Sequence, residues 1–262
     1  MTRASPPTPF TGTATDYARH RPPYPEAFLS ALRGCAKSTG HGSLLDLACG
    51  PGRVAIPMAR HFARVLAVDV EPDMIAVGEQ EATARGVTNI AWLVARAEDL
   101  ELARASIELI TIGEAFHRLD QRAILAAALR WLEPRGAIAT LGGEPVWRGT
   151  ERWQLALVDV VDRWTRGAVR DHNAGPWGGP DRELLTAGFA VEVGEHTVER
   201  VWTCDELIGL MRSTSIASRQ AIGDGADRFA AELRAALLAV DPNDRFPTRQ
   251  RFSFTVGTRR TG

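Results

Sequence analysis

The sequence predicts one α/β domain built on a mainly parallel sheet, and two observations carry this prediction. The apolar run at residues 44–47 leads into a glycine-rich turn, Gly50-Pro51-Gly52, which is typical of a buried strand that feeds the N-terminus of a helix. Apolar runs then alternate with helical patterns as far as residue 141. Such alternation indicates parallel strands joined by helices that cover both faces of the sheet. No internal repeat or linker divides residues 1–262, so a single domain is expected.

The first expected elements follow directly after the glycine turn. Residues 53–62 are expected to be helical, and Pro57 is expected to bend the first turn of this helix. A second helix over residues 74–84 and a third strand over residues 90–93 come next.

A further helix is expected after Asp120, whose side chain suits an N-cap. The apolar face of this helix ends with Leu132, Pro134 terminates it, and residues 137–141 form the fifth strand. In the C-terminal half, helices are expected over residues 151–164, 204–212 and 227–240, and a Gly/Pro-rich loop over residues 170–180. Two strands are also expected there, one over residues 191–201 and one around Phe252, Phe254 and Val256.

Composition narrows the class of protein. The chain has 31 basic and 32 acidic residues, a net charge of −1, and no long block of like charge, so neither a nucleic acid nor a membrane surface is an expected partner. Three cysteines without metal-ligand spacing indicate neither a disulfide framework nor a metal site. No apolar run reaches the length of a membrane span, and residues 1–9 are expected to be a frayed tail rather than a signal segment. A cytoplasmic location is therefore expected, while the oligomeric state stays open.

A carboxylate follows the glycine turn at an informative distance. Asp69 ends the next apolar run and lies 19 residues after Gly50, the separation that places a carboxylate on the two hydroxyls of a bound ribose. The unit is therefore expected to bind a cofactor that contains a nucleoside. The turn alone also fits the G-x-G-x-x-G/A spacing of dinucleotide sites, so a nicotinamide dinucleotide and S-adenosylmethionine both remain candidates.

Five motifs in chain order decide between these cofactors. The run at residues 44–53 resembles motif I of the class I S-adenosylmethionine-dependent methyltransferases, with Ala48 in place of the first glycine. The other resembling segments are residues 67–75, 95–100, 107–117 and 132–136. The resemblance implies a Rossmann-like, doubly wound, seven-stranded sheet of order 3-2-1-4-5-7-6 whose last strand is antiparallel. Residues 10–36, 145–182 and 203–223 are expected to be helical lid elements that hold substrate specificity.

The resemblance also implies S-adenosylmethionine as cofactor, S-adenosylhomocysteine as product, and a set of binding residues. Asp46 is expected either to reach loop amides and the methionine end or simply to organise the turn. Arg21 is expected either to pair with the cofactor carboxylate or to lie in a surface turn, and Met74 either to pack on the adenine or to fill the core. The full set is Tyr17, Arg21, Asp46, Ala48, Gly50, Gly52, Asp69, Val70, Met74, Ala97, Glu98, Gly113 and Glu114.

His117 is the candidate catalytic base. It follows the expected fourth strand within Ala115-Phe116-His117, which resembles the family's Ala-Phe-His-Trp, and a neutral imidazole accepts a proton near pH 7. A structural, hydrogen-bonded histidine is the alternative, and His172 is the second candidate for the base. No metal is expected to take part.

The expected function is transfer of a methyl group from S-adenosylmethionine to oxygen or nitrogen of a small molecule. One alternative is a carboxylate methyltransferase, because residues 202–207 and 213–215 resemble enzymes near the trans-aconitate methyltransferases. Arg118, Arg148 or Arg212 would then clamp the acid. A second alternative is a protein that binds S-adenosylmethionine without transfer. A nicotinamide oxidoreductase is disfavoured, because the single lysine, Lys37, precedes the first strand and provides no Tyr-x-x-x-Lys donor.

Overall fold

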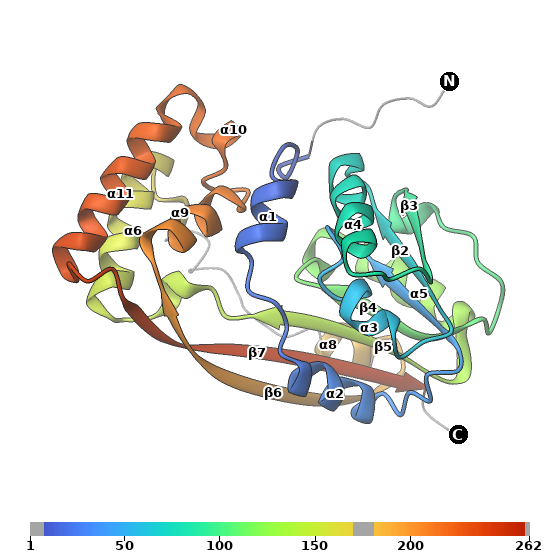
Figure 1. Cartoon of the computed structure of the whole chain (residues 1–262). Helices are drawn as coiled ribbons and strands as arrows, with labels where there is room; N and C mark the ends of the chain where they lie inside the picture. The colour runs from blue at the N-terminus through green and yellow to red at the C-terminus, as the bar shows by residue number, and fades with distance from the viewer. Residues whose placement is uncertain (1–7, 170–180, 260–262) are drawn as a thin grey trace. The chain divides into compact units, whose positions relative to one another are not determined.

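The computed structural model describes residues 8–169 and 181–259 (Figure 1). The described residues form two compact units. Residues 23–143, 181–196 and 252–259 make up the sheet unit, and residues 8–22, 144–169 and 197–251 make up the helical unit. Most of the expected tail at residues 1–9, and the loop with His172, lie outside the described residues.

The sheet has seven strands in the order β3-β2-β1-β4-β5-β7-β6, which confirms the order that the resemblance implies. Strands β1 to β5 pair in parallel, and β7 is antiparallel to β5. The strands are β1 (Ser43–Leu47), β2 (Arg64–Asp69), β3 (Ile90–Val94), β4 (Ile107–Gly113), β5 (Leu132–Gly143), β6 (Phe189–Trp202) and β7 (Phe246–Arg259). Strand β1 is buried, and the strand order reverses between β1 and β4, so a ligand crevice is expected at the carboxyl ends of these two strands.

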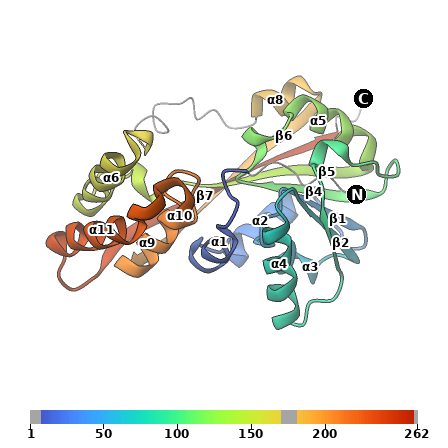
Figure 2. The same cartoon turned by 90° about the horizontal axis from the view of Figure 1, so that it is seen from above.

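Helices cover both faces of the sheet unit. Figure 2 shows α2, α3 and α4 on one face and α5 and α8 on the other. These helices are α2 (Glu26–Cys35), α3 (Ala55–Ala59), α4 (Pro72–Ala84), α5 (Gln121–Trp131) and α8 (Asp181–Thr186). Leu45, Ile110 and Ile138 from three adjacent strands are fully buried beneath the second group, so the apolar strand runs form the core of this unit.

Two helices differ from the predicted ones by more than small shifts of one or two residues at an end, or in what ends them. Helix α3 spans only Ala55–Ala59, because Gly52 has a φ of 82° and residues 51–54 form turns rather than helix. Helix α5 begins after Asp120, which accepts a hydrogen bond from the amide of Ala123 as predicted, but it ends at Trp131. Leu132 is already extended and pairs with β4, so Pro134 lies within β5 instead of terminating the helix.

The helical unit has its own apolar core. Trp202, Phe229 and Phe246 are among its most buried side chains. Its elements are α1 (Ala14–His20), α6 (Arg152–Thr165), α9 (Cys204–Arg212), α10 (Arg219–Ile222) and α11 (Ala226–Val240), with short 3-10 turns at Val146–Arg148 and Gly223–Gly225. Helix α9 has the predicted bounds, because Thr203 and Glu206 form a capping box at its first turn. None of the described helices is long and apolar enough to cross a membrane.

A buried carboxylate fixes the loop that leads into β1. Glu108, on β4, accepts hydrogen bonds from the amides of Gly40 at 3.0 Å and Gly42 at 2.7 Å. The hydroxyls of Ser38 and Thr39 and the amide of Thr39 also donate to it. Burial opposes ionisation of Glu108, but these donors outweigh it and hold the pKa of the carboxyl below its usual value.

Glu108→Ala is expected to lower the free energy of unfolding by about 2–4 kcal/mol, because several donors lose a charged acceptor. Since the folded pKa lies below the unfolded one, the contribution is present above the unfolded pKa and disappears as pH falls through the folded pKa. Urea unfolding at neutral and acidic pH measures both effects. Glu101→Ala, which removes an exposed carboxylate from the loop before β4, is the control, and equal losses in the two variants would contradict the assignment.

Candidate cofactor site

The turn between β1 and α3 depends on three residues with positive φ. Ala48, Gly50 and Gly52 have φ values of 51°, 53° and 82°. Glycine adopts these angles freely, whereas alanine in the left-handed region costs about 1–2 kcal/mol. A Cβ on Gly52 would also lie 2.7 Å from the ring of Trp92, so glycine is required there by packing as well. The turn is therefore strained at Ala48 and tightly packed at Gly52.

The side chain of Asp46 stabilises this turn through hydrogen bonds. Its side chain is buried, and its two carboxylate oxygens accept from the amide of Ala55 at 3.0 Å and from the hydroxyl of Thr111 at 2.8 Å. The carboxylate thus ties the start of α3 to β4, which is the turn-organising role that the sequence left open. Thr111 is a partner that the sequence analysis missed. Burial raises the pKa of Asp46 to about 7, although the two hydrogen bonds act in the opposite direction.

Asp46→Asn is expected to change the pH dependence of stability. Between about pH 4 and 7 folded Asp46 retains a proton that the unfolded chain has released, so this group makes stability fall as pH rises through that window. At 1.36 kcal/mol per pH unit, the free energy of unfolding falls by at most about 4 kcal/mol across this window. The asparagine variant, which has no titrating group here, should not show this fall. Urea unfolding from pH 4 to 8 tests this, with exposed Asp99→Asn as control. An unchanged slope in Asp46→Asn would contradict the expectation.

Asp69 ends β2 beside the same turn. Its carboxylate accepts from the amide of Gly50 at 2.8 Å and from the amide of Glu71 at 2.9 Å, one on each oxygen. Burial raises the pKa of Asp69, and these amides counteract the shift. The amide of Val70 also stabilises this carboxylate. A carboxylate has about four acceptor positions, so one that receives these three amides retains room for a further hydroxyl donor. Contact of Asp69 with the hydroxyls of a ribose stays a prediction.

The expected adenine-binding residues lie on neighbouring elements of the sheet unit. Ala97 is buried and opens the 3-10 turn Ala97–Asp99, and Met74 is buried in the first turn of α4. Val70 lies between β2 and α4. Glu98 accepts from the amide of Asp120 at 3.0 Å and lies 3.4 Å from Arg96, so its side chain connects the 3-10 turn to the start of α5. Contact of these four residues with a nucleoside stays a prediction.

The carboxyl end of β4 brings together residues from three segments. Gly113 ends the strand, and Glu114 follows with a φ of 54°. Arg53, directly after the glycine turn, lies 3.4 Å from the Glu114 carboxylate and stacks on the ring of Tyr24 with 4.6 Å between the guanidinium carbon and the ring centroid. The sequence analysis missed Arg53 and Tyr24 as site residues, although Arg53 adjoins Gly52. His117 lies three residues after Glu114, in the 3-10 turn Phe116–Arg118, and its side chain is exposed.

Tyr17 and Arg21 belong to the helical unit. Tyr17 lies on α1, and the guanidinium of Arg21, just after this helix, stacks over the Tyr17 ring at 4.9 Å. The Nε of Arg21 donates to the hydroxyl of Ser213 at 2.9 Å. Both residues are therefore ordered against α9 within their own unit, and a role in binding the cofactor stays a prediction.

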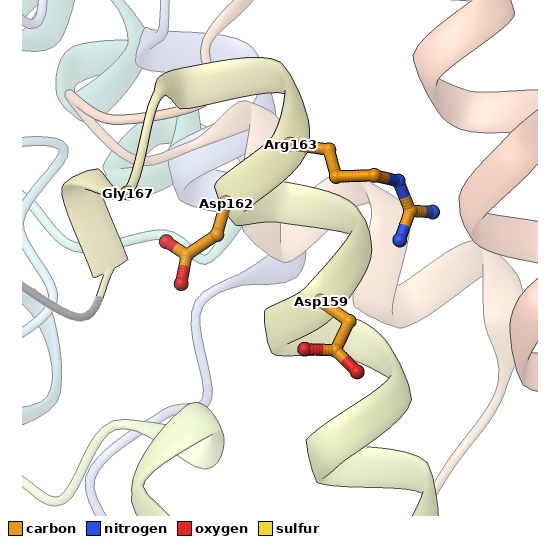
Figure 3. Close-up of a pocket in the computed structure, with 4 residues that line it drawn as sticks. All are labelled: Asp159, Asp162, Arg163 and Gly167. Atoms are coloured by element: carbon orange, nitrogen blue, oxygen red, sulfur yellow. The ribbon is translucent and has the colours of Figure 1, made fainter.

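The helical unit also contains a pocket of about 230 Å³ on α6, lined by Asp159, Asp162, Arg163 and Gly167. Figure 3 shows the arginine extending away from the two carboxylates, and Arg163 bonds Glu232 of α11 at 2.5 Å. None of these residues belongs to the expected cofactor set. Among the residues that the structure describes, no cluster of histidine, cysteine and acidic side chains is arranged to hold a metal ion.

Comparison with known proteins places these features in a family. The profile described as a methyltransferase domain matches residues 44–136. The chain is 36% identical to a ubiquinone/menaquinone biosynthesis C-methyltransferase of Rubrivivax gelatinosus over 122 residues, which cover 46% of this chain and 47% of that protein. It is 31% identical to a ubiquinone biosynthesis O-methyltransferase of Cereibacter sphaeroides over 173 residues, 54% of this chain and 69% of that protein.

Solved structures agree on the fold. A protein of Anaeromyxobacter dehalogenans, provisionally assigned as a type II methyltransferase, superposes with a TM-score of 0.60 at 23% identity, covering 92% of this chain and 97% of that one. The chain spans about half the length of the Rubrivivax gelatinosus relative and about two thirds of the Cereibacter sphaeroides relative. The chain belongs to the class I S-adenosylmethionine-dependent methyltransferases. These are enzymes whose cofactor is S-adenosylmethionine.

Proposed function

We propose that this protein transfers the methyl group of S-adenosylmethionine to an oxygen or nitrogen atom of a small molecule. The observation that carries the proposal is the turn at residues 48–54, held by Asp46 and flanked by the Asp69 carboxylate, which retains acceptor capacity for a ribose hydroxyl. The two relatives act in quinone biosynthesis, one as a C- and one as an O-methyltransferase, so they support a small acceptor and leave its reacting atom to experiment.

The proposed role of each residue in methyl transfer follows from its position in the fold. The bound cofactor supplies a methyl group already activated by its sulfonium. Asp69 binds the ribose, and the turn presents its backbone to the methionine portion. The protein must hold the acceptor lone pair about 3 Å from the methyl carbon and in line with the breaking bond. His117, exposed just beyond the end of β4, accepts the proton that the acceptor loses.

A small acceptor is favoured over a nucleic acid by charge. The net charge of −1 means that the chain carries no overall excess of positive charge, which proteins that bind phosphate backbones commonly have. We also propose a cytoplasmic location, and we propose that residues 10–36, 145–182 and 203–223 determine which acceptor is used.

For the alternative function as a carboxylate methyltransferase, Arg212 is a weak candidate to bind the acid, because it lies 3.4 Å from Asp227 and pairs with that carboxylate.

The test is an assay with S-adenosylmethionine that carries a deuterated methyl group. The purified chain is incubated with panels of phenols, amines and carboxylic acids, and mass spectrometry records deuterated products and S-adenosylhomocysteine. The proposal expects a deuteromethyl ether or amine in stoichiometric yield with S-adenosylhomocysteine. A deuteromethyl ester would support the carboxylate alternative instead. Binding of the cofactor without any turnover across the panels would support a binding protein.

A further inference from the structure

Helix α1 depends on the rest of the helical unit for its structure. It spans seven residues, whereas an isolated helix needs about 12–15 residues to be stable in water. The helix packs against α9, and Ala14 in its first turn is buried. Directly after α1, the Nε of Arg21 donates at 2.9 Å to the hydroxyl of Ser213, which directly follows α9. Contacts with α9 and with the residue that follows it therefore help to keep α1 helical.

The last residue of α1 takes the place of a side chain that α9 lacks. A Cβ on Gly209 would overlap the Cγ, Nδ1 and Cδ2 atoms of His20, so the imidazole ring lies directly against the backbone of α9. Gly209 lies in the interior of α9, where glycine is less favourable than alanine, and it has no positive φ that would require glycine. The close approach of His20 is therefore the structural reason for a glycine at this position.

Two charged groups of α1 itself face His20. The carboxylate of Asp16 lies 3.9 Å from Nε2 and raises the pKa of the imidazole, whereas Arg19 lowers this pKa. Both residues belong to α1, so they stay close to His20 whether or not the helix is docked on α9. They therefore contribute little to any difference in pKa between the docked and the undocked helix.

Burial and the charges of α9 act on His20 only while α1 is docked. Burial has the largest effect, and it lowers the pKa of the imidazole below its usual value. On α9, Asp205 and Glu206 attract an imidazolium, and Arg212 repels it. Both carboxylates already pair with arginines of the same unit. A proton on His20 is therefore less favourable in the docked helix than in the undocked one.

We propose that the imidazole of His20 is a pH-dependent latch between α1 and α9. The neutral ring lies against Gly209 and holds α1 in place, whereas the protonated ring leaves this position and α1 detaches. Docking is then strongest above about pH 6.5, the ordinary pKa of an exposed imidazole. It weakens as the pH falls from that value through the lower pKa of docked His20.

The consequence of this latch for catalysis rests on the proposed function. Residues 10–36 and 203–223, which contain α1 and α9, are the segments that we propose to determine which acceptor is used. Release of α1 in acid is therefore expected to raise the KM for the acceptor.

Hydrogen exchange of the full chain, without any ligand, tests the latch. The amides of α1 are compared with those of α11 in the same unit, after correction for intrinsic exchange rates. Relative to α11, α1 is expected to exchange at least about 3-fold faster at pH 5 than at pH 8, because these values lie on either side of the ordinary imidazole pKa.

Three variants identify the group that responds to pH. His20→Phe keeps a ring against Gly209 but binds no proton, so α1 should stay protected at both pH values. Gly209→Ala displaces the ring and should speed exchange in α1 at both pH values, while α9 gains a better helix former. His41→Ala removes an exposed histidine of the sheet unit and is the control, which should keep the wild-type pH dependence.

Two results of the exchange experiment would overturn the inference. One is equal protection of α1 at pH 5 and pH 8 in the wild-type chain. The other is the same pH dependence in His20→Phe as in the wild type, because another group would then be responsible. The experiment needs neither cofactor nor acceptor, so a failure of methyl transfer would contradict the proposed function and leave the latch standing.

The link to catalysis has its own measurement. With an identified acceptor, the KM of the wild type is expected to rise between pH 8 and pH 5 by more than that of His20→Phe. A rise of equal size in both would overturn the link between the latch and acceptor binding.

Discussion

Replacing His117 by alanine is expected to lower kcat by about 10²–10⁴-fold, the usual contribution of a general base. The side chain is exposed in the 3-10 turn that follows β4, so it is open to an acceptor that loses a hydroxyl or amine proton. Affinity for S-adenosylmethionine should barely change, because the expected cofactor contacts lie on other residues. The pH–rate profile of kcat should also lose the inflection that a titrating general base produces.

Steady-state kinetics on the identified acceptor measures both effects. His41→Ala is the matched control, because His41 is an exposed histidine of the same unit in the loop before β1. Near-normal turnover in His117→Ala, with the inflection retained, would mean that alignment of the acceptor alone carries the reaction. His117 would then have the structural role that the sequence left open.

Asp69→Ala is expected to weaken binding of S-adenosylmethionine by about 10- to 100-fold or more. Charge-assisted hydrogen bonds to two ribose hydroxyls contribute about 1.5–3 kcal/mol, which converts to this change in affinity. The variant also removes the acceptor of the Gly50 and Glu71 amides, so the turn itself loses support. Asp69→Asn keeps the side-chain volume and one acceptor oxygen, and it should retain more affinity than the alanine variant.

Isothermal titration calorimetry on folded variants measures this loss. Asp73→Ala is the control, since Asp73 is an exposed carboxylate in the first turn of α4. An unchanged dissociation constant in folded Asp69→Ala would remove Asp69 from the cofactor site.

Local patterns in the sequence were sufficient for most of the fold. Alternating strands and helices predicted the parallel sheet, the family resemblance implied the strand order, and Asp120 was expected to cap the start of α5. The bounds of α9 were also predicted, whereas the capping box of Thr203 and Glu206 was found only in the structure. The predicted end of α5 was wrong, because Leu132 is already extended and pairs with Ile107 of β4. Helix α3 is likewise shorter than predicted because of the positive φ of Gly52, which the spacing of apolar residues does not reveal.

Side-chain partners were harder to predict, because they join residues that are distant in sequence. The pairing of Asp46 with Thr111, and of Arg53 with Tyr24 and Glu114, depends on which strands lie side by side. The sequence marked Asp46 and Glu114 as site residues without their partners. Likewise, the sequence showed that Ala48 replaces the motif's first glycine, but only the structure shows that Ala48 occupies the left-handed region at a cost in strain.

Titration of the wild-type chain with S-adenosylmethionine and, separately, with NADH tests the central claim most directly. Both cofactors contain a ribose that Asp69 could bind, but only NADH requires a turn that cradles a pyrophosphate. The expected result is one S-adenosylmethionine bound per chain, with a dissociation constant in the range of about 1 μM to 1 mM that is usual for enzyme ligands, and no heat of binding for NADH. Saturable binding of NADH, together with no binding of S-adenosylmethionine, would contradict the account.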